Sequence, residues 1–169
     1  MSVKPLVVVV GPPAAGKTRV AKQLGKILGV DVVDTDTEVV KRWGPIPDLF
    51  ASHGEEFFRA QEREAVESAL MTQGVVALGG GAVVNPATQA DLMAHRVALI
   101  SITAEAVAPR LDNDKRPLLQ GGLEAWKELV ASRREIYQAV ATREFDASHR
   151  SMDDLADEVV AWVREDAEL

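Results

Sequence analysis

The residues best suited to chemistry form a short loop near the start of the chain, directly after the valines at 7–10. A glycine, four residues and then Gly-Lys-Thr is the spacing of a phosphate-binding loop. The matching residues are Gly11, Pro12, Pro13, Ala14, Ala15, Gly16, Lys17 and Thr18. In such a loop, backbone N–H groups bind phosphate oxygens, the lysine reaches the β- and γ-phosphates, and the hydroxyl is a magnesium ligand.

The segments on either side of this loop match the same interpretation. A run of β-branched valines predicts a buried parallel strand. Apolar residues then recur with helical spacing at Val20, Ala21, Leu24, Ile27 and Leu28. A chance match at an ordinary strand–turn–helix junction is the alternative. Because the loop lies between a strand and a helix, we favour binding of a nucleoside triphosphate.

Two further predicted strands are followed by residues that could bind a ligand or take part in catalysis. The apolar segment 30–33 leads into Asp34-Thr35-Asp36. A carboxylate at such a strand end can hold a magnesium-bound water or accept a hydrogen bond from a substrate hydroxyl. Helix capping by a box at 35–38 is an equally good interpretation of these residues.

The second of these strands, 75–78, is followed at once by Gly79, Gly80 and Gly81. Three glycines permit close approach of the backbone to a ligand, although a flexible turn is the alternative. Many phosphate-loop enzymes place a magnesium-organising aspartate after such a strand. None stands here, so Asp34 is expected to take that role.

Four arginines lie inside predicted helices. Arg59 and Arg63 fall in the helix expected at 55–71, and Arg133 and Arg134 in the helix expected at 123–140. Taken alone, each is expected on a solvated helix face, where Arg59 would pair with nearby glutamates. Between these helices, the segment 112–122 is charged at its start and ends in two glycines, which is typical of a mobile lid but also of a simple loop.

Composition narrows the class of protein. The chain has 169 residues, a net charge of −7 and no cysteine, and its calculated pI is about 5.0. This charge argues against nucleic acid as a partner. No apolar run is long enough for a membrane, and no room is left for a signal peptide, so a cytoplasmic location is expected. The three histidines are scattered, without metal-ligand spacing.

Strands alternate with helices along the chain. This order predicts an α/β fold, a doubly wound, five-stranded parallel sheet in a three-layer α/β/α arrangement. We expect a single domain over 1–169, with an acceptor-binding region at about 35–62 and a lid at about 112–122.

Together these stretches resemble shikimate kinases, small phosphate-loop proteins related to nucleoside-monophosphate kinases. The resemblance runs almost from end to end. It rests on the phosphate loop, on Asp34-Thr35-Asp36, Phe58-Arg59, Leu78-Gly79-Gly80-Gly81 and Arg116-Pro117-Leu118-Leu119, and on Arg133 four residues before Tyr137.

The resemblance implies transfer of the γ-phosphate of ATP to the 3-hydroxyl of shikimate, in aromatic amino acid biosynthesis, by a monomer. It implies catalytic roles for Lys17, Asp36 and Arg116. The implied shikimate-binding residues are Asp36, Arg59, Gly79, Gly80, Gly81 and Arg133. Thr18 and Asp34 would serve Mg²⁺, Arg116 would close over the phosphates, and Arg110 would lie against adenine.

Two features depart from the family pattern. Relatives usually carry glycine and serine where this loop has Ala14 and Ala15, and alanine lacks the freedom of glycine to adopt positive φ. The segment between Arg110 and Arg116 is also slightly short.

Two other functions stay open on the sequence. A gluconate-type kinase of the same fold would also use paired arginines for a carboxylate-bearing polyol. A nucleotide-binding regulatory module without turnover is the other alternative. The residues whose joint presence argues against it are Lys17, Thr18, Asp34, Asp36 and Arg116.

Overall fold

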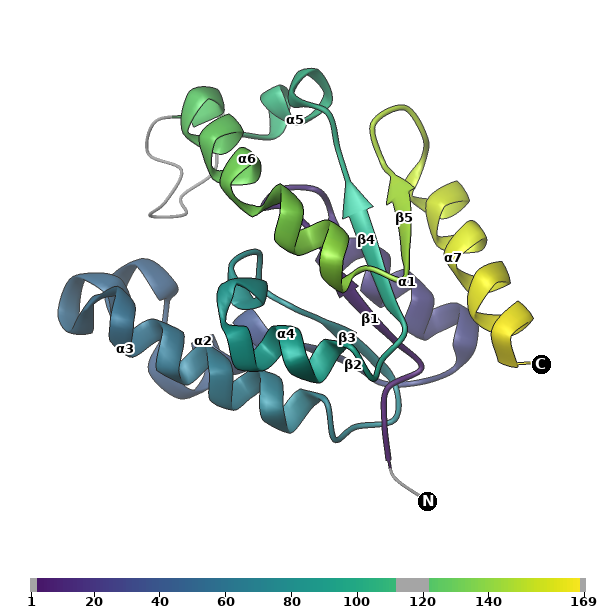
Figure 1. The fold of residues 1–169 in the computed structure, drawn as a ribbon, viewed down its shortest axis with the longest axis horizontal. Coiled ribbons are helices and arrows are strands. Elements are labelled where there is room, and N and C mark those ends of the chain that lie inside the picture. The colour runs from purple at the N-terminus through teal and green to yellow at the C-terminus, as the bar shows by residue number, and fades with distance from the viewer. Residues whose placement is uncertain (1–2, 112–121, 168–169) are drawn as a thin grey trace.

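The central feature of the computed structural model, which describes residues 3–111 and 122–167, is a parallel sheet (Figure 1). Its five strands lie in the order β2-β3-β1-β4-β5, and all four neighbouring pairs are parallel. The strands are β1 (Val7–Val10), β2 (Val32–Asp34), β3 (Val75–Ala77), β4 (Val97–Ser101) and β5 (Arg143–Asp146). The predicted α/β fold with a five-stranded parallel sheet is therefore confirmed.

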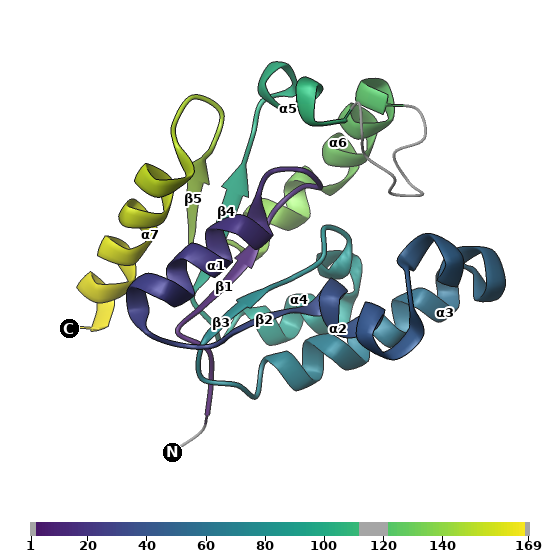
Figure 2. The same ribbon diagram turned by 180° about the vertical axis from the view of Figure 1, so that it is seen from behind.

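Helices cover both faces of the sheet. Alternate valines of β1 supply the two sides: Val7 and Val9 pack with α1 (Lys17–Leu28) and α7 (Met152–Ala167), as Figure 2 shows from that side. Val8 and Val10 pack against the opposite layer. That layer contains α4 (Pro86–Leu92), α6 (Gly122–Val140), the end of α3 (Ile46–Ala69) and the short 3₁₀ helix η1 (Ala82–Val84). All four residues of β1 are buried, as a central parallel strand requires.

A pair of helices projects beyond the sheet on the side of β2 (Figure 1). It consists of α2 (Thr35–Trp43) and the first part of α3, joined through a small core of Val39, Leu49 and Phe58. Gly54 interrupts α3 with φ 86°, so the helix has two segments around a kink. The helix predicted at 55–71 corresponds to the second segment of α3. The first segment of α3 begins directly after Pro45.

The remaining helix, α5 (Ala104–Leu111), follows β4 and contains Pro109. The predicted lid at 112–122 and its Arg116 lie outside the described residues, apart from the first residue of α6. Within the described ranges, no helix combines the length and the apolar character needed to cross a membrane.

Candidate active site

The residues singled out by the sequence gather where the parallel strands end. The phosphate loop follows β1, Asp34 closes β2, and the glycines at 79–81 follow β3 within one residue. Because β2, β3 and β1 are neighbours in the sheet, these loops lie at one edge of it. Ligands of open α/β sheets bind in the crevice at this edge.

The phosphate loop is a compact turn with positive φ at three residues. Gly11 has φ 151°, Ala14 has φ 65°, and Gly16, which caps α1, has φ 98°. Ala14 is the only residue other than glycine with positive φ in the ranges 3–111 and 122–167. An alanine in this region costs roughly 1–2 kcal/mol because its Cβ approaches the following carbonyl. The departure noted in the sequence therefore carries a conformational cost.

Side chains from three helices hold the outer carbonyl groups of this loop. The buried Nζ of Lys17 donates to the carbonyl oxygen of Pro12 at 2.8 Å. Trp126 donates its indole N–H to Pro13 O at 2.8 Å, and Arg110 donates from Nη1 to Ala14 O at 3.0 Å. These three carbonyl groups are occupied, and remaining N–H groups of the loop can bind an anion.

A hydroxyl and a carboxylate meet beside the loop. Thr18 donates its Oγ1 hydrogen to Asp34 Oδ2 at 2.6 Å. The other oxygen of Asp34 accepts from the backbone N–H of Thr37 at 3.1 Å, so Asp34 is the N-cap of α2. The alternative interpretation, a capping box that begins at Thr35, is therefore wrong, because the N-cap is Asp34. Thr35 is fully buried and instead accepts from the N–H of Gly79 at 3.0 Å.

The glycines after β3 make room for two charged side chains. A methyl group on Gly79 would overlap the carboxylate of Asp36, and one on Gly81 would overlap the guanidinium of Arg59. Asp36 and Arg59 therefore converge on the same short turn from α2 and α3. These two glycines are needed for close approach of a neighbour, which a simple flexible turn would not require.

Arg59 is held by a buried carboxylate one helical turn away. Its Nη1 lies 2.8 Å from Glu62 Oε1, and Glu62 is buried. Burial raises the pKa of Glu62, while the charge and hydrogen bond of Arg59 oppose that shift. The arginine was expected, on its helix alone, to pair with glutamates at a solvated surface. It has the glutamate partner, but the glutamate is buried and the arginine is only partly exposed.

Arg133 is the second arginine at this edge, and it is more deeply buried than Arg59. Only 6% of its surface is exposed, although the pattern of α6 alone favoured a solvated position. It hydrogen-bonds Tyr137, whose pKa is raised by burial and lowered by this arginine. The Tyr137 hydroxyl donates to Gly80 O at 2.7 Å, which ties α6 to the glycine turn.

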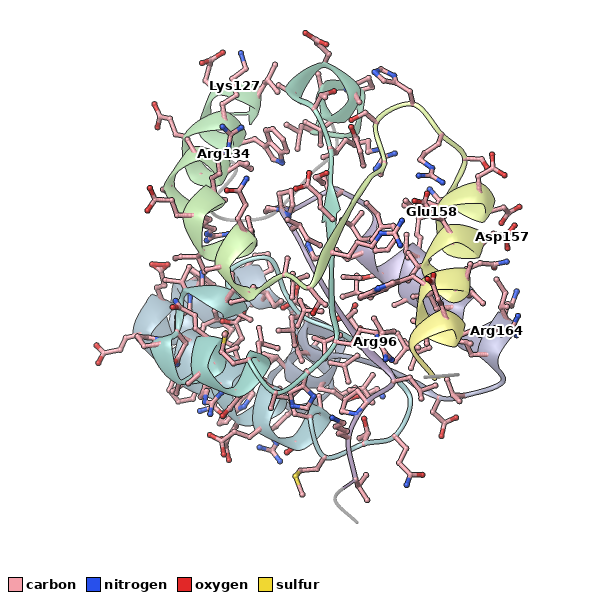
Figure 3. The ribbon with its side chains drawn as sticks, turned by 45° about the vertical axis from the view of Figure 1, so that its right-hand side comes forward. Arg96, Lys127, Arg134, Asp157, Glu158 and Arg164 are labelled. Carbon is pink, nitrogen blue, oxygen red and sulfur yellow. The ribbon has the colours of Figure 1, made fainter. Side chains whose placement is uncertain are left out.

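Two other arginines lie away from this group. Arg63 donates to two side chains of α4: Nη1 to Thr88 Oγ1 at 2.8 Å and Nη2 to Asp91 Oδ2 at 2.6 Å. Arg134, next to Arg133 in the sequence, is exposed on α6 (Figure 3). The solvated position expected for Arg134 is confirmed.

Sequence reasoning missed the inward positions of Glu62 and Trp126. For Glu62 a signal was available, because Phe58, Glu62 and Val66 share one face of α3 and its neighbours on that face are buried. A glutamate in an apolar stripe needs a partner, since a buried charge without one is costly. No such signal was present for Trp126, because a tryptophan in an apolar helix face is first interpreted as a residue of the hydrophobic core.

These features define a phosphate-loop kinase of small molecules: a parallel α/β sheet, a phosphate loop before α1, and charged side chains at the edge of the sheet where an acceptor would bind. Comparison with known proteins identifies the family. The family model described as shikimate kinase matches residues 13–164. The chain belongs to the shikimate kinase family, and it is an ATP-dependent kinase, a transferase.

Individual relatives agree over nearly the whole length. A shikimate kinase from Thermobifida fusca is 45% identical over 161 residues, which cover 93% of this chain and 94% of the relative. A solved shikimate kinase from Acinetobacter baumannii, in complex with shikimate, superposes with a TM-score of 0.88 at 28% identity. That alignment covers 97% of this chain and 94% of the other. A gluconokinase from Sinorhizobium meliloti, at 16% identity and a TM-score of 0.65, shares the fold alone.

Proposed function

We propose that this protein transfers the γ-phosphoryl group of ATP to the 3-hydroxyl of shikimate, giving shikimate 3-phosphate and ADP, as a step of aromatic amino acid biosynthesis. The observation that carries the proposal is the convergence of Asp36 and Arg59 on the glycine turn beside the phosphate loop. Membership of the shikimate kinase family supports the choice of acceptor.

The nucleotide side of the proposal uses the residues at 11–18. Backbone N–H groups from Ala14 onward bind phosphate oxygens, since Pro12 and Pro13 have none to donate. Lys17 offsets the charge that develops on the transferring group. Arg110, which lies against the outside of the loop at Ala14, is assigned to the nucleotide, with adenine as its expected contact.

Thr18 and Asp34 fit a magnesium ion. They place a hydroxyl and a carboxylate oxygen side by side, and Mg²⁺ prefers oxygen ligands, retaining waters and phosphates in its shell. Among the described residues no three acidic, histidine or cysteine side chains form a metal cluster, and we assign the rest of the shell to the waters and substrate phosphates that Mg²⁺ usually retains. When bound, the ion supplies charge neutralisation at the phosphates.

The acceptor side uses one carboxylate and two arginines. Asp36 accepts hydrogen bonds from ring hydroxyls and orients the attacking 3-hydroxyl. It need not remove the proton early, because a loose transition state leaves that proton largely in place. Arg59 and Arg133 bind the shikimate carboxylate, for which the planar guanidinium is suited, and the backbone of Gly79, Gly80 and Gly81 lines the same pocket.

Several parts of the proposal stay predictions. Arg116, the third catalytic residue expected from the sequence, lies outside the described residues. The single kinase domain over 1–169, its acceptor-binding region at about 35–62, the monomeric state, the cytoplasmic location and the absence of nucleic-acid and membrane partners are likewise expectations.

One assay tests the proposal against its main alternative. ADP release is measured with ATP and magnesium and with shikimate, gluconate, quinate or nucleoside monophosphates as acceptor. Shikimate is expected to give the highest kcat/KM. Faster turnover of gluconate would favour a gluconate-type kinase, and faster turnover of a nucleotide would favour a nucleotide kinase. ATP binding without turnover of any acceptor would favour the regulatory module.

A further inference from the structure

Trp126 is a buried side chain of α6 with one polar atom, and that atom contacts the phosphate loop. Only 3% of Trp126 is exposed. Its indole N–H donates to the carbonyl oxygen of Pro13 at 2.8 Å, across 113 residues of sequence. The rest of the ring packs in the apolar cluster that includes Leu111 and Ile102. Apolar packing alone would not require the N–H, so its direction toward the loop needs a separate explanation.

The conformation of the phosphate loop depends on hydrogen bonds from other parts of the fold. Pro12 and Pro13 cannot donate backbone hydrogen bonds, so only their carbonyl groups can fix this half of the loop. Ala14, the next residue, is held at φ 65°. A non-glycine residue keeps such a conformation only where its surroundings impose it.

The support comes from consecutive carbonyl groups, each bound by a different helix. Lys17 of α1 binds Pro12 O, Trp126 of α6 binds Pro13 O, and Arg110 of α5 binds Ala14 O. Lys17 and Arg110 are charged groups already assigned to the nucleotide. Trp126 is the neutral member, and its N–H is assigned no other role.

We propose that Trp126 is a positioning residue for the nucleotide: its indole N–H fixes Pro13 O and so holds the phosphate loop, with Ala14 in its left-handed conformation, in the form that binds the phosphates of ATP. This inference rests on the proposed function. It assigns Trp126 no contact with either substrate.

The test is Trp126→Phe, which keeps an aromatic ring and removes the donor. The matched control is Trp162→Phe on α7, because Trp162 is also buried in the same apolar cluster and lies outside the site. Nucleotide Kd is measured by calorimetry with ADP and magnesium, and KM for ATP and shikimate by ADP release.

Trp126→Phe loses one hydrogen bond to a buried carbonyl, so the nucleotide Kd and the KM for ATP are expected to rise about two- to thirteenfold. The KM for shikimate is expected to change less than twofold. Trp162→Phe is expected to leave all three unchanged. Equal nucleotide Kd in the wild type and Trp126→Phe, or equal losses in both variants, would overturn the inference while leaving the proposed function intact. A wild-type protein that binds no nucleotide would overturn both.

A second measurement decides the matter if Trp126→Phe does not fold. In a variant carrying Trp43→Phe and Trp162→Phe, Trp126 is the single tryptophan. Its emission is expected to change when ADP and magnesium bind, and to change less with shikimate alone. An emission spectrum that ADP leaves unaltered at saturation would overturn the inference.

Discussion

The carboxylate of Glu62 lies 2.8 Å from Nη1 of Arg59, and the two side chains differ in exposure: 5% for Glu62 and 27% for Arg59. One end of the pair is therefore inside the fold, and the other opens toward the acceptor edge. Arg59 also stacks over Phe58 at 5.2 Å and lies 3.7 Å from Glu55. These contacts fix the direction of the guanidinium before any carboxylate ligand arrives, which lowers the ordering cost of binding.

The raised pKa of Glu62 makes a testable contribution to stability. Burial raises this pKa above its ordinary value, Asp36 adds to the shift, and Arg59 and Arg133 oppose it. The folded protein therefore holds the Glu62 proton more tightly than the unfolded chain. The corresponding stability is fully present below the ordinary carboxyl pKa and is lost as the pH rises through the raised pKa.

Glu62→Gln should remove this pH dependence. The free energy of unfolding of the wild type, relative to that of Glu62→Gln, is expected to fall as the pH is raised from about 4 to about 7, as measured by urea titration. The exposed Glu64→Gln on the same helix serves as control and should show no such trend. A wild-type advantage that is independent of pH would mean that Glu62 does not titrate with a raised pKa.

Lys17 offers a direct test of the phosphate loop. In Lys17→Ala the cation that offsets charge on the transferring group is lost, and kcat is expected to fall at least about a hundredfold. The measurement is ADP release at saturating ATP and shikimate, with circular dichroism to confirm folding. Near-normal kcat would show that the loop at 11–18 does not hold the reacting phosphates.

Local spacing made much of this architecture predictable. The phosphate loop, the carboxylates after β2 and the glycines after β3 are short patterns whose geometry depends on adjacent residues. Because all the strands are parallel, their carboxyl ends meet at one edge, so the sequence could predict that these loops share the ligand crevice, while the strand order that makes them neighbours came from the structure.

The burial of individual side chains could not be predicted in the same way. Arg133 and Arg134 are consecutive in α6, yet one is buried and the other is exposed. Arg133 shares a helix face with the buried Trp126, Tyr137 and Val140, but the pattern of one helix does not show that an arginine on that face has a partner there. The difference arises from packing of α6 against the glycine turn through Tyr137, a contact between residues 57 positions apart. Likewise, the direction of the Trp126 N–H depends on where α6 crosses the phosphate loop.

The left-handed Ala14 predicts a stabilising substitution. Ala14→Gly relieves a conformational cost of roughly 1–2 kcal/mol, whereas glycine adds about 0.4–1 kcal/mol of unfolded-state entropy cost. The balance is a net gain of up to about 1.6 kcal/mol in the free energy of unfolding. Ala15→Gly is the matched control: Ala15 has no positive φ and is fully buried, so its replacement should destabilise the protein. Urea unfolding distinguishes the two, and destabilisation by both would contradict a strained Ala14.

Arg133 and Arg134 provide the sharpest test of the acceptor site, because they are neighbours of the same type with opposite exposure. Arg133→Ala removes a buried guanidinium that we assign to the shikimate carboxylate, and the expected loss in shikimate binding is about 2–5 kcal/mol. The KM for ATP should change little, since the contacts of the phosphate loop come from Lys17, Trp126 and Arg110. Arg134→Ala should leave both KM values unchanged (Figure 3).

Loss of Arg133 also leaves the Tyr137 hydroxyl without one partner, so a structural effect on the glycine turn must be separated from lost binding. Tyr137→Phe removes the tie to Gly80 while retaining Arg133. If Arg133 binds the carboxylate, Arg133→Ala weakens shikimate much more than Tyr137→Phe does, and Arg133→Lys restores part of the loss because it keeps the charge without the planar fork. Equal losses in Arg133→Ala and Tyr137→Phe, with no recovery in Arg133→Lys, would instead make Arg133 a support of the glycine turn.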